Sequence, residues 1–391
     1  MKRYRLLAAL AALILVLAAC TEAADTTTTA GDGGAETTAA GGDEETTTTG
    51  ADSETSTTEG TAAPAGALLG EVQSRGTLNC GVNDAVPGFG SVDDAGTPVG
   101  FDIDFCRAVA AAVLGNADAV EFVVLTAEQR FTALQSGEID VLIRNTTRTA
   151  TRDGAEGATF LTTTFYDGQG MMVAADSGFT SIDEMTDTNI CVLSGTTTEL
   201  NLATRMAGIP YTPLTFDDNE QLQAAFVAGQ CDGWTSDKSQ LSGVRSAWPA
   251  DQGGPETLVI LEETFSKEPL GPVVRDGDSQ WAQVIDWVTI STIQAEEFGI
   301  TSENVDTFGD TEDAAIRRFL GLEITDDDGN TSVFDAGLGL DPGFAAAVVA
   351  AVGNYAEIYD RNVGPATALG LERGVNALWT DGGLLYPPPY R

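Results

Sequence analysis

The chain has 391 residues, 42% of them hydrophobic, which is enough for two or three domains with sizeable cores. Its 59 acidic and 19 basic residues give a net charge of −40, which argues against nucleic acid as a partner because nucleic acid binding needs clustered cations. The absence of histidine excludes Ser-His-Asp and Cys-His catalysis, a histidine-ligated zinc site and a histidine proton switch.

The first twenty residues predict an export signal. Three basic residues precede an apolar run over residues 6–16, which is too short to span a membrane. The following Leu17-Ala18-Ala19-Cys20 resembles the lipobox of bacterial lipoproteins, in which cleavage before the cysteine leaves a diacylglyceryl thioether on its sulfur. A lipid on Cys20 would hold the protein on the outer face of a membrane. The alternative is an ordinary secretory signal in which Cys20 is incidental.

Residues 21–67 form a segment of Thr, Ala, Gly and acidic residues without aromatic or basic side chains. Such a composition cannot bury a core, so we expect a disordered linker. A flexible chain of this length has a root-mean-square reach of about 35–40 Å. The linker would therefore act as a tether between an anchor at Cys20 and the folded part.

The folded part begins near Leu68, with a strand at residues 76–82 and a loop at residues 83–98. A helix over residues 100–114, with Asp102 as N-cap, and a strand over residues 120–125 follow.

Next comes a helix that Gly137 should end, then a β-branched run at residues 139–143 that predicts a buried strand. Directly after it stands the polar loop Asn-Thr-Thr-Arg-Thr-Ala-Thr-Arg, which ends at Arg152. A buried strand that delivers a polar loop at its carboxyl end is typical of a ligand site in an open α/β sheet.

The second half of the chain repeats this pattern. Gly137-Glu138-Ile139-Asp140 corresponds to Gly229-Gln230-Cys231-Asp232, and five residues after each Asp stands a polar residue, Asn145 or Asp237. The repeat predicts two similar lobes that face a shared cleft, although helix–Gly–strand units also recur by coincidence in α/β proteins.

Between the two units, residues 170–175 are a candidate crossing, residues 182–185 a short helix and residues 189–193 the first strand of lobe two. A helix then opens at Ser194-Gly195-Thr196-Thr197, where Thr196 and Glu199 fit a capping box. This turn would either bind an anion such as a carboxylate or serve only as a cap.

The C-terminal part should return to the first lobe. Residues 263–274 are the candidate return crossing, and helices are expected at residues 281–298 and 344–359, before an extended tail at residues 384–391. We therefore predict an N-terminal part of lobe one at residues 68–170, lobe two at 171–270, and a return with extra C-terminal helices at 271–391.

Several motifs in this order resemble the substrate-binding proteins of polar amino acid ABC transporters. Gly100-Phe101-Asp102-Ile103-Asp104 is similar to their helix start, and NTTRT, CVLSGTTTELNLA, SKEPLGPVVRDGD and GVNALWTDGGLLYPPPYR have close counterparts in the general L-amino-acid and glutamate/glutamine-type branch. The resemblance implies an α/β, two-lobed periplasmic-binding-protein-like fold of type II, with two open sheets flanked by helices and two crossover strands. It also implies closure around one amino acid, without a cofactor.

The resemblance carries ligand contacts onto named residues. Arg152 would bind the ligand carboxylate with Thr147 and, from lobe two, Thr197 beside Thr196, while Asp237 and the backbone carbonyl of Asn145 would take the ammonium. A zwitterion does need a guanidinium fork and a carboxylate on opposite sides of a cleft, which couples binding to closure. The alternatives are a surface salt bridge of Arg152 with Asp153 or Glu156, and a helix cap by Asp237 near Lys238.

Contacts to the ligand side chain are less specific. Relatives carry a stacking aromatic where this chain has Val86, and Phe89, three residues on, would either stack on the ligand or belong to the core. Arg148 replaces a Trp of the close branch and, if it faced the pocket, would favour an acidic or amide side chain. Arg144 could do the same or form a salt bridge at the strand end. Asn83 completes the candidate set.

Removal of Cys20 for lipid attachment leaves four cysteines, Cys80, Cys106, Cys191 and Cys231, in an oxidising setting. Three pairings are possible, of which Cys80–Cys106 and Cys191–Cys231 is the economical one because two cysteines fall in each lobe. A zinc site would be the alternative, but the wide spacings lack CxxC pairs.

Three classes of function follow. The first is a monomeric extracytoplasmic receptor that captures a polar L-amino acid and delivers it to an ABC permease. The second is a lipoprotein that senses an amino acid and signals to a partner receptor. The third is an enzyme on the same scaffold, since amino-acid dehydratases resemble this fold, although the chain offers no convincing nucleophile–base pair.

Overall fold

The computed structural model describes residues 67–326 and 328–391, all within one compact unit of the chain. The predicted signal peptide, Cys20 and almost all of the predicted linker lie outside these residues. Within the described part, no helix is both long and apolar enough to cross a bilayer, and no group of three or more acidic or cysteine residues is arranged to hold a metal ion.

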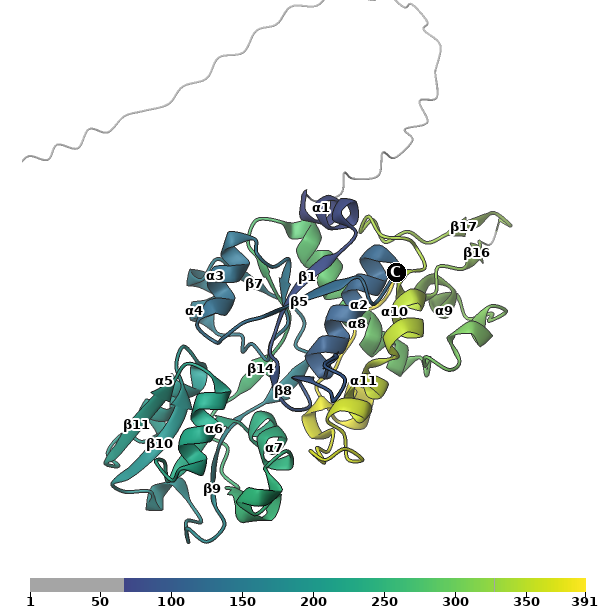
Figure 1. The fold of residues 1–391 in the computed structure, drawn as a ribbon. Coiled ribbons are helices and arrows are strands. Elements are labelled where there is room, and N and C mark those ends of the chain that lie inside the picture. The colour runs from purple at the N-terminus through teal and green to yellow at the C-terminus, as the bar shows by residue number, and fades with distance from the viewer. Residues whose placement is uncertain (1–66, 327) are drawn as a thin grey trace, which may run out of the picture. The chain divides into compact units, whose positions relative to one another are not determined.

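The first lobe contains a five-stranded sheet in the order β5-β1-β6-β15-β7 (Figure 1). β1 is parallel to β5 and β6, whereas β15 is antiparallel to β6 and β7. Alternate residues of β6 and its flank enter different cores: Val141 and Ile143 pack on one face, and Leu142 on the other. This period of two explains why a continuous apolar run forms a strand that is buried on both faces. The strands are β1 (Leu78–Val82), β5 (Val120–Val124), β6 (Val141–Leu142), β7 (Ala158–Phe160) and β15 (Val273–Arg275).

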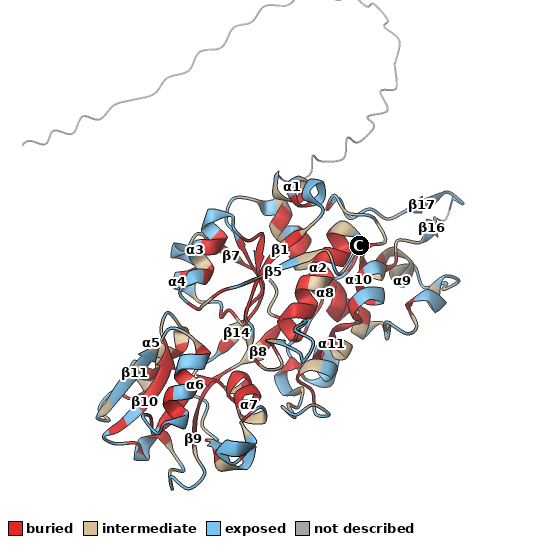
Figure 2. Ribbon diagram, in the orientation of Figure 1, coloured by how far each residue is buried: buried red, intermediate tan, exposed pale blue. Residues whose placement is uncertain are grey.

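Helices cover both faces of this sheet. α2 and α8 contribute to the large core on one face, and α3 contributes to the smaller core on the other. Figure 2 shows that much of α2, α8 and the sheet is buried, whereas the edge strand β5 is partly exposed. Gly137 ends α3 in the left-handed conformation with φ 77°, as predicted. The helices are α1 (Ala67–Arg75), α2 (Phe101–Leu114), α3 (Gln129–Ser136), α4 (Ala150–Ala155) and α8 (Ser279–Glu297).

The second lobe repeats the arrangement with a sheet in the order β11-β10-β12-β9-β13. β10 is parallel to β11 and β12, and β9 is antiparallel to β12 and β13. Here too an inner strand alternates: in β10, Ile190 lies in one core and Cys191 in the other. The elements are β9 (Gln169–Ala174), β10 (Thr188–Leu193), β11 (Tyr211–Phe216), β12 (Gly233–Asp237), β13 (Leu258–Ile260), α5 (Thr197–Arg205), α6 (Asn219–Val227) and α7 (Lys238–Ser246).

Two short antiparallel strands, β8 (Phe165–Asp167) and β14 (Glu268–Leu270), connect the lobes (Figure 1). The prediction that residues 170–175 form the crossing is wrong, because β9 lies inside the second sheet and pairs there with β12. The chain crosses one strand earlier, at β8. The predicted return segment does contain β14, which is followed by β15 of the first sheet.

The segment after β1 also differs from the prediction. The expected loop at residues 83–98 holds a small antiparallel sheet of β2 (Ala85–Val86), β3 (Gly90–Val92) and β4 (Pro98–Val99). α2 begins after Gly100 without a side-chain cap, so Asp102 is not the N-cap. Its buried carboxylate instead accepts a hydrogen bond from the backbone N–H of Asn145 at 2.7 Å.

The C-terminal extension packs onto the first lobe through the core shared with α2 and α8. The single helix predicted over residues 344–359 is broken, because Gly353 has φ 80° and Asn354 caps a new helix. The ring of Tyr390 packs against Trp287, Phe319 and Phe334. The remaining elements are α9 (Ala314–Phe319), β16 (Glu323–Thr325), β17 (Thr331–Val333), α10 (Phe344–Val352), α11 (Tyr355–Asn362) and 3₁₀ turns at Ile182–Glu184, Ala250–Gln252, Pro255–Thr257, Val305–Phe308, Gly374–Asn376 and Trp379–Asp381.

Two disulfides link Cys80 with Cys106 and Cys191 with Cys231, with Cα atoms 6.1 and 5.7 Å apart. The first ties β1 to α2, and the second ties β10 to the residues before β12. The economical pairing is thereby confirmed, and it leaves these four sulfurs unable to bind zinc. Each bridge stays within one lobe, so neither restrains movement between the lobes.

Candidate ligand-binding site

The carboxyl ends of the central strands of both sheets meet at one cavity. β6 leads into Arg144 and Asn145, β10 leads into the turn before α5, and β12 ends at Asp237. The cavity volume is about 20 Å³, little more than one water molecule needs. An amino acid is larger, so the lobes must separate to admit one. The polar lining residues are Asn83, Arg130, Arg144, Asn145, Thr147, Arg152, Thr196, Thr197, Thr198, Ser236, Asp237 and Gln240.

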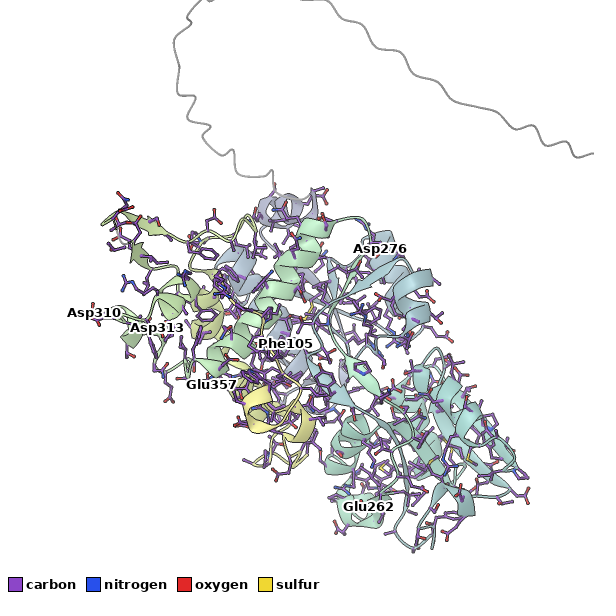
Figure 3. All side chains as sticks on the ribbon, turned by 180° about the vertical axis from the view of Figure 1, so that it is seen from behind. Phe105, Glu262, Asp276, Asp310, Asp313 and Glu357 are labelled. Carbon is purple, nitrogen blue, oxygen red and sulfur yellow. A yellow bond between two sulfur atoms is a disulfide. The ribbon has the colours of Figure 1, made fainter. Side chains whose placement is uncertain are left out.

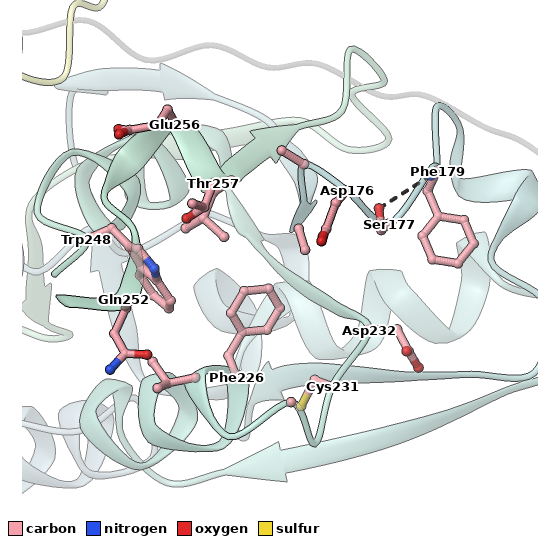
Figure 4. Close-up of a pocket in the computed structure, with 15 residues that line it drawn as sticks. Asp176, Ser177, Phe179, Phe226, Cys231, Asp232, Trp248, Gln252, Glu256 and Thr257 are labelled. Atoms are coloured by element: carbon pink, nitrogen blue, oxygen red, sulfur yellow. Dashed lines mark hydrogen bonds between the residues drawn. The ribbon is translucent and has the colours of Figure 1, made fainter. Parts of the chain in front are cut away.

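A larger pocket of about 560 Å³ lies elsewhere on the second lobe (Figure 4). Its wall includes the rings of Phe226 and Trp248, and Asp232 stands at its side. It lies at the amino end of β12, whereas the charged cavity lies at the carboxyl end. Because it contains no basic side chain, it cannot pair with a carboxylate, and we place the candidate site in the smaller cavity.

Arg152 is buried in α4, and its Nη1 donates to the backbone oxygen of Thr147 at 2.9 Å. Burial lowers the pKa of this guanidinium, although nearby carboxylates, Glu268 first, oppose the shift. The salt-bridge alternative fails, because Asp153 pairs with Arg148 and Glu156 makes no ion pair with Arg152. The guanidinium is therefore held by the backbone of Thr147 and lines the cavity, and within the described part of the chain it has no carboxylate partner.

The second lobe meets this group through the turn before α5. Thr196 caps the helix by accepting from the N–H of Glu199 at 3.1 Å, while Glu199 accepts from the N–H of Gly195 rather than that of Thr196. The hydroxyls of Thr147 and Thr197 are 3.4 Å apart across the cavity. The hydroxyls and helix N-terminus expected around one carboxylate are thus brought together.

Asp237 is 5% exposed, and its Oδ1 has no hydrogen-bond partner. Burial raises the pKa of this carboxyl well above its usual range, and the neighbouring Asp167 and Glu268 add to the shift. The helix-cap alternative fails, because its side chain makes no capping bond at the start of α7, and Lys238 donates to the carbonyl of Glu262 instead. A positively charged ligand group would stabilise the ionised form.

Asn145 lies beside it in a strained conformation with φ 32°. The Asp102 carboxylate holds its backbone N–H, and its Oδ1 has no partner. Burial raises the pKa of Asp102 to about 7. Asp102 thus fixes the backbone at Asn145, whose carbonyl is the predicted acceptor for the ligand ammonium.

Three predicted side-chain contacts are not at the cavity. Phe89 is 1% exposed and packs against Phe101 and Phe165 at ring distances of 5.7 and 5.1 Å, so it belongs to the core, as does the fully buried Val86. Arg148 has a half-exposed side chain that pairs with Asp153 at 2.7 Å. It precedes α4 and its side chain is open to solvent.

Two other candidates do line the cavity. Asn83 is buried there and accepts from the N–H of Ala85 at 3.2 Å. Arg144 is buried too, and its Nε donates to the carbonyl of Leu125 at 2.7 Å rather than to a carboxylate at the strand end.

Among the polar lining residues, sequence reasoning missed Arg130, Thr198, Ser236 and Gln240. Arg130 is 3% exposed, and a signal for it existed. It stands four residues before the buried Leu134, so a helix places both on one face. The helical period that predicted α3 therefore also predicts that this guanidinium points inward.

Comparison with known proteins identifies relatives of this chain. Residues 78–302 match the model of bacterial extracellular solute-binding proteins, family 3. The general L-amino acid-binding periplasmic protein AapJ of Rhizobium johnstonii is 46% identical over 85% of this chain and 95% of its own. The glutamate/glutamine/aspartate/asparagine-binding protein BztA of Rhodobacter capsulatus is 45% identical over 84% and 95%.

Among solved structures, an ABC transporter periplasmic binding protein from Brucella ovis with glutathione bound superposes with a TM-score of 0.77. It is 43% identical and covers 83% of this chain and 99% of its own. The predicted two-lobed fold is thus confirmed, and the relatives are binding proteins rather than enzymes. With more than half of its length matched, the chain belongs to family 3 of the bacterial extracellular solute-binding proteins.

Proposed function

We propose that this protein captures a polar L-amino acid between its lobes and delivers it to an ABC permease. The ligand carboxylate is held by Arg152, Thr147 and the turn at Thr196 and Thr197. The ammonium is held by Asp237 and by the carbonyl of Asn145. Amino acid binding is named for the relatives AapJ and BztA, which supports this ligand class.

One observation carries the proposal. Among the described residues, five buried side-chain polar atoms lack a hydrogen-bond partner, and three of them belong to residues at this cavity: Arg130, Asn145 and Asp237. Buried polar groups are normally paired, because an unpaired one costs about 1–3 kcal/mol. Unpaired donors and acceptors of both charges, gathered at one cavity, are what a zwitterion would satisfy.

The division of charges explains capture. Arg152 belongs to the first lobe and Asp237 to the second, so only a closed arrangement completes both contacts with one ligand. Ligand binding then favours closure by the difference in its affinity for the two states. We propose that the closed, monomeric complex is the form recognised by the permease, and that a lipid on Cys20 keeps it near the membrane.

Isothermal calorimetry tests the binding step on the chain without residues 1–20. We titrate the twenty L-amino acids, together with the glutathione bound in the Brucella structure. At least one polar L-amino acid should bind at micromolar or lower concentration, as the unpaired groups require.

Variants locate the site. Arg152→Ala and Asp237→Ala should each weaken binding by about 2–5 kcal/mol, because each leaves a buried charge unpaired. Arg148→Ala, which removes an exposed guanidinium from the same loop, is the matched control and should leave the affinity unchanged. Unchanged affinity in either of the first two variants would remove this site assignment.

A further inference from the structure

Both lobes carry exposed carboxylates, so closure brings two negatively charged bodies together. Examples are Glu262 on the second lobe, and Asp276, Asp310 and Asp313 on the first lobe and its extension (Figure 3). The net charge of the chain is −40, and charge of one sign opposes a compact arrangement through self-repulsion. A closed arrangement therefore needs short-range contacts between the lobes that offset this repulsion.

Such contacts lie between β2 of the first lobe and α6 and α7 of the second. They include a chain of hydrogen bonds between amide side chains. The Nδ2 of Asn145 donates to the Oε1 of Gln240 at 3.4 Å, and the Nε2 of Gln240 donates to the Oδ1 of Asn219 at 2.9 Å. The Nδ2 of Asn219 then donates to the carbonyl of Ala85 at 3.4 Å. The chain thus begins in the first lobe, passes through the second and returns to the first.

Only two of these three hydrogen bonds cross between the lobes. Asn219 and Gln240 are buried and both belong to the second lobe, so their mutual bond does not depend on closure. The bond from Asn219 to Ala85 and the bond from Asn145 to Gln240 exist only while the lobes are together. These two bonds therefore stabilise closure rather than either lobe.

A glycine in α7 lets the backbones of the two lobes approach each other at the same place. Gly243 is buried within this helix, and a Cβ atom there would overlap the backbone oxygen of Pro87 in the first lobe. Its backbone is helical rather than of positive φ, so the helix itself does not require glycine. Glycine within a helix costs stability relative to alanine. The close approach of Pro87 accounts for that cost.

We propose that Asn219 and Gly243 form a latch with residues 85–87 that stabilises the closed arrangement independently of the ligand. The latch rests on the closure that the proposed function requires, but neither residue lines the charged cavity. The apparent affinity for a ligand scales with the population of the arrangement that binds it. Loss of the latch should therefore weaken every ligand by the same factor.

Two substitutions remove the latch without harming the second lobe. Asn219→Asp keeps an acceptor for Gln240 but offers no N–H to the carbonyl of Ala85. An acid at this position, the first residue of α6, also suits the helix dipole. Gly243→Ala favours the helix, but its methyl group overlaps Pro87 when the lobes close.

Each substitution has a matched control in the first lobe. Asn116→Asp adds the same charge at an exposed position after α2. Gly70→Ala adds the same methyl group to a helical glycine of α1, where no atom lies within 4 Å of the new carbon. Neither control touches the second lobe, so both should behave as wild type.

Double electron–electron resonance on the ligand-free chain without residues 1–20 measures the separation of the lobes. Spin labels are attached at Asp94→Cys and Ala224→Cys, which are exposed positions of the first and second lobe. Wild-type protein should show a short and a long separation, and each latch variant should lower the short population by at least about half. Calorimetry should then show that the dissociation constants of L-glutamine and L-asparagine rise by one common factor of at least about two.

The outcomes separate the latch from the proposed function. Wild-type protein with only the long separation, or latch variants with wild-type populations, would overturn the latch. If no amino acid binds, the proposed function fails, whereas the ligand-free separations still decide on the latch. Thermal unfolding at or above the wild-type temperature shows that the second lobe of a variant is intact. If one latch variant unfolds early, the other decides, and if both do, these residues stabilise the second lobe rather than closure.

Discussion

The two lobes share one strand order but differ in how the first strand connects to the following helix. In the second lobe, residues 194–196 lead directly from β10 into α5, whose start faces the cavity with hydroxyls and backbone N–H groups. In the first lobe, residues 83–100 intervene and hold β2 to β4. The helix that follows, α2, starts with the buried acid Asp102. The two lobes thus share a strand order, but they bring different functional groups to the cavity.

Side-chain hydrogen bonds support duplication more strongly than the sequence repeat alone. Asp140 accepts from the backbone N–H of Asn79 at 2.7 Å, and Asp232 accepts from that of Asn189 at 2.7 Å. The Nδ2 of each Asn donates to the carbonyl of the residue two positions before that Asp, at 3.4 and 3.3 Å. Equivalent side chains therefore join equivalent strands in both lobes, which coincidence does not explain.

The lobes differ most at the second residue of the helix that follows their first strand. This residue is the titratable Asp102 in α2 and the neutral Thr198 in α5. Burial raises the pKa of Asp102 from 3.8 to about 7. Between these values Asp102 binds more protons in the folded state than in the unfolded state. Its contribution to the free energy of unfolding is therefore largest at low pH and falls as the pH rises. Asp102→Asn removes this dependence. Its stability relative to wild type should rise by up to about 4 kcal/mol from pH 4 to pH 8.

Urea unfolding at a series of pH values measures this difference. Asp118→Asn replaces an exposed carboxyl of the same lobe and should give a profile parallel to that of wild type. Parallel profiles for Asp102→Asn and wild type would show that Asp102 ionises normally in the folded state.

The disulfides test how far each lobe depends on a covalent link. The bridges span 26 residues in the first lobe and 40 in the second. Loop-closure entropy gives each about 3–4 kcal/mol. The first lobe also shares a large core with the C-terminal extension, whereas the second is held by two small clusters. We therefore expect Cys191→Ala/Cys231→Ala to produce a separate early unfolding transition.

Differential scanning calorimetry on that variant and on Cys80→Ala/Cys106→Ala makes the comparison. The first-lobe variant should shift the main transition without splitting it. The second lobe is not the less stable one if the unfolding transition splits in the first-lobe variant instead. The same conclusion follows if both variants shift a single transition equally.

Much of the fold and part of the site could be predicted from the sequence. The helices α2 and α8 were expected from the sequence, and polar residues after buried strands identified Asn145 and Asp237. The outward crossing could not be located, because β8 has three residues and carries no period. β2 to β4 were missed for the same reason.

At the site, the sequence predicts which residue types gather better than which way each side chain turns. Arg148 and Arg152 belong to one loop, yet only Arg152 turns inward, because it falls within α4. The family resemblance suggested Val86 at the ligand and left Phe89 open between the ligand and the core, and both side chains are buried in the core of the first lobe. Arg130 shows the converse, since its helical face predicts burial although its charge suggests the surface.

The repeated Asp offers the mildest test of the comparison. Asp140 is 3% exposed and also pairs with Arg75, whereas Asp232 is exposed and has no such ion pair. Asp140→Ala leaves the partly buried N–H of Asn79 without its acceptor and should lower the free energy of unfolding by about 1–3 kcal/mol. Burial raises the pKa of Asp140, so removing the carboxylate also relieves a desolvation cost, which keeps the loss in this range.

Asp232→Ala should cost less than about 1 kcal/mol, because water can replace its hydrogen bond. Urea unfolding at pH 7 compares the two variants. Equal losses of unfolding free energy would mean that these hydrogen bonds join the strands equally strongly in both lobes. The burial of Asp140 would then add nothing to stability.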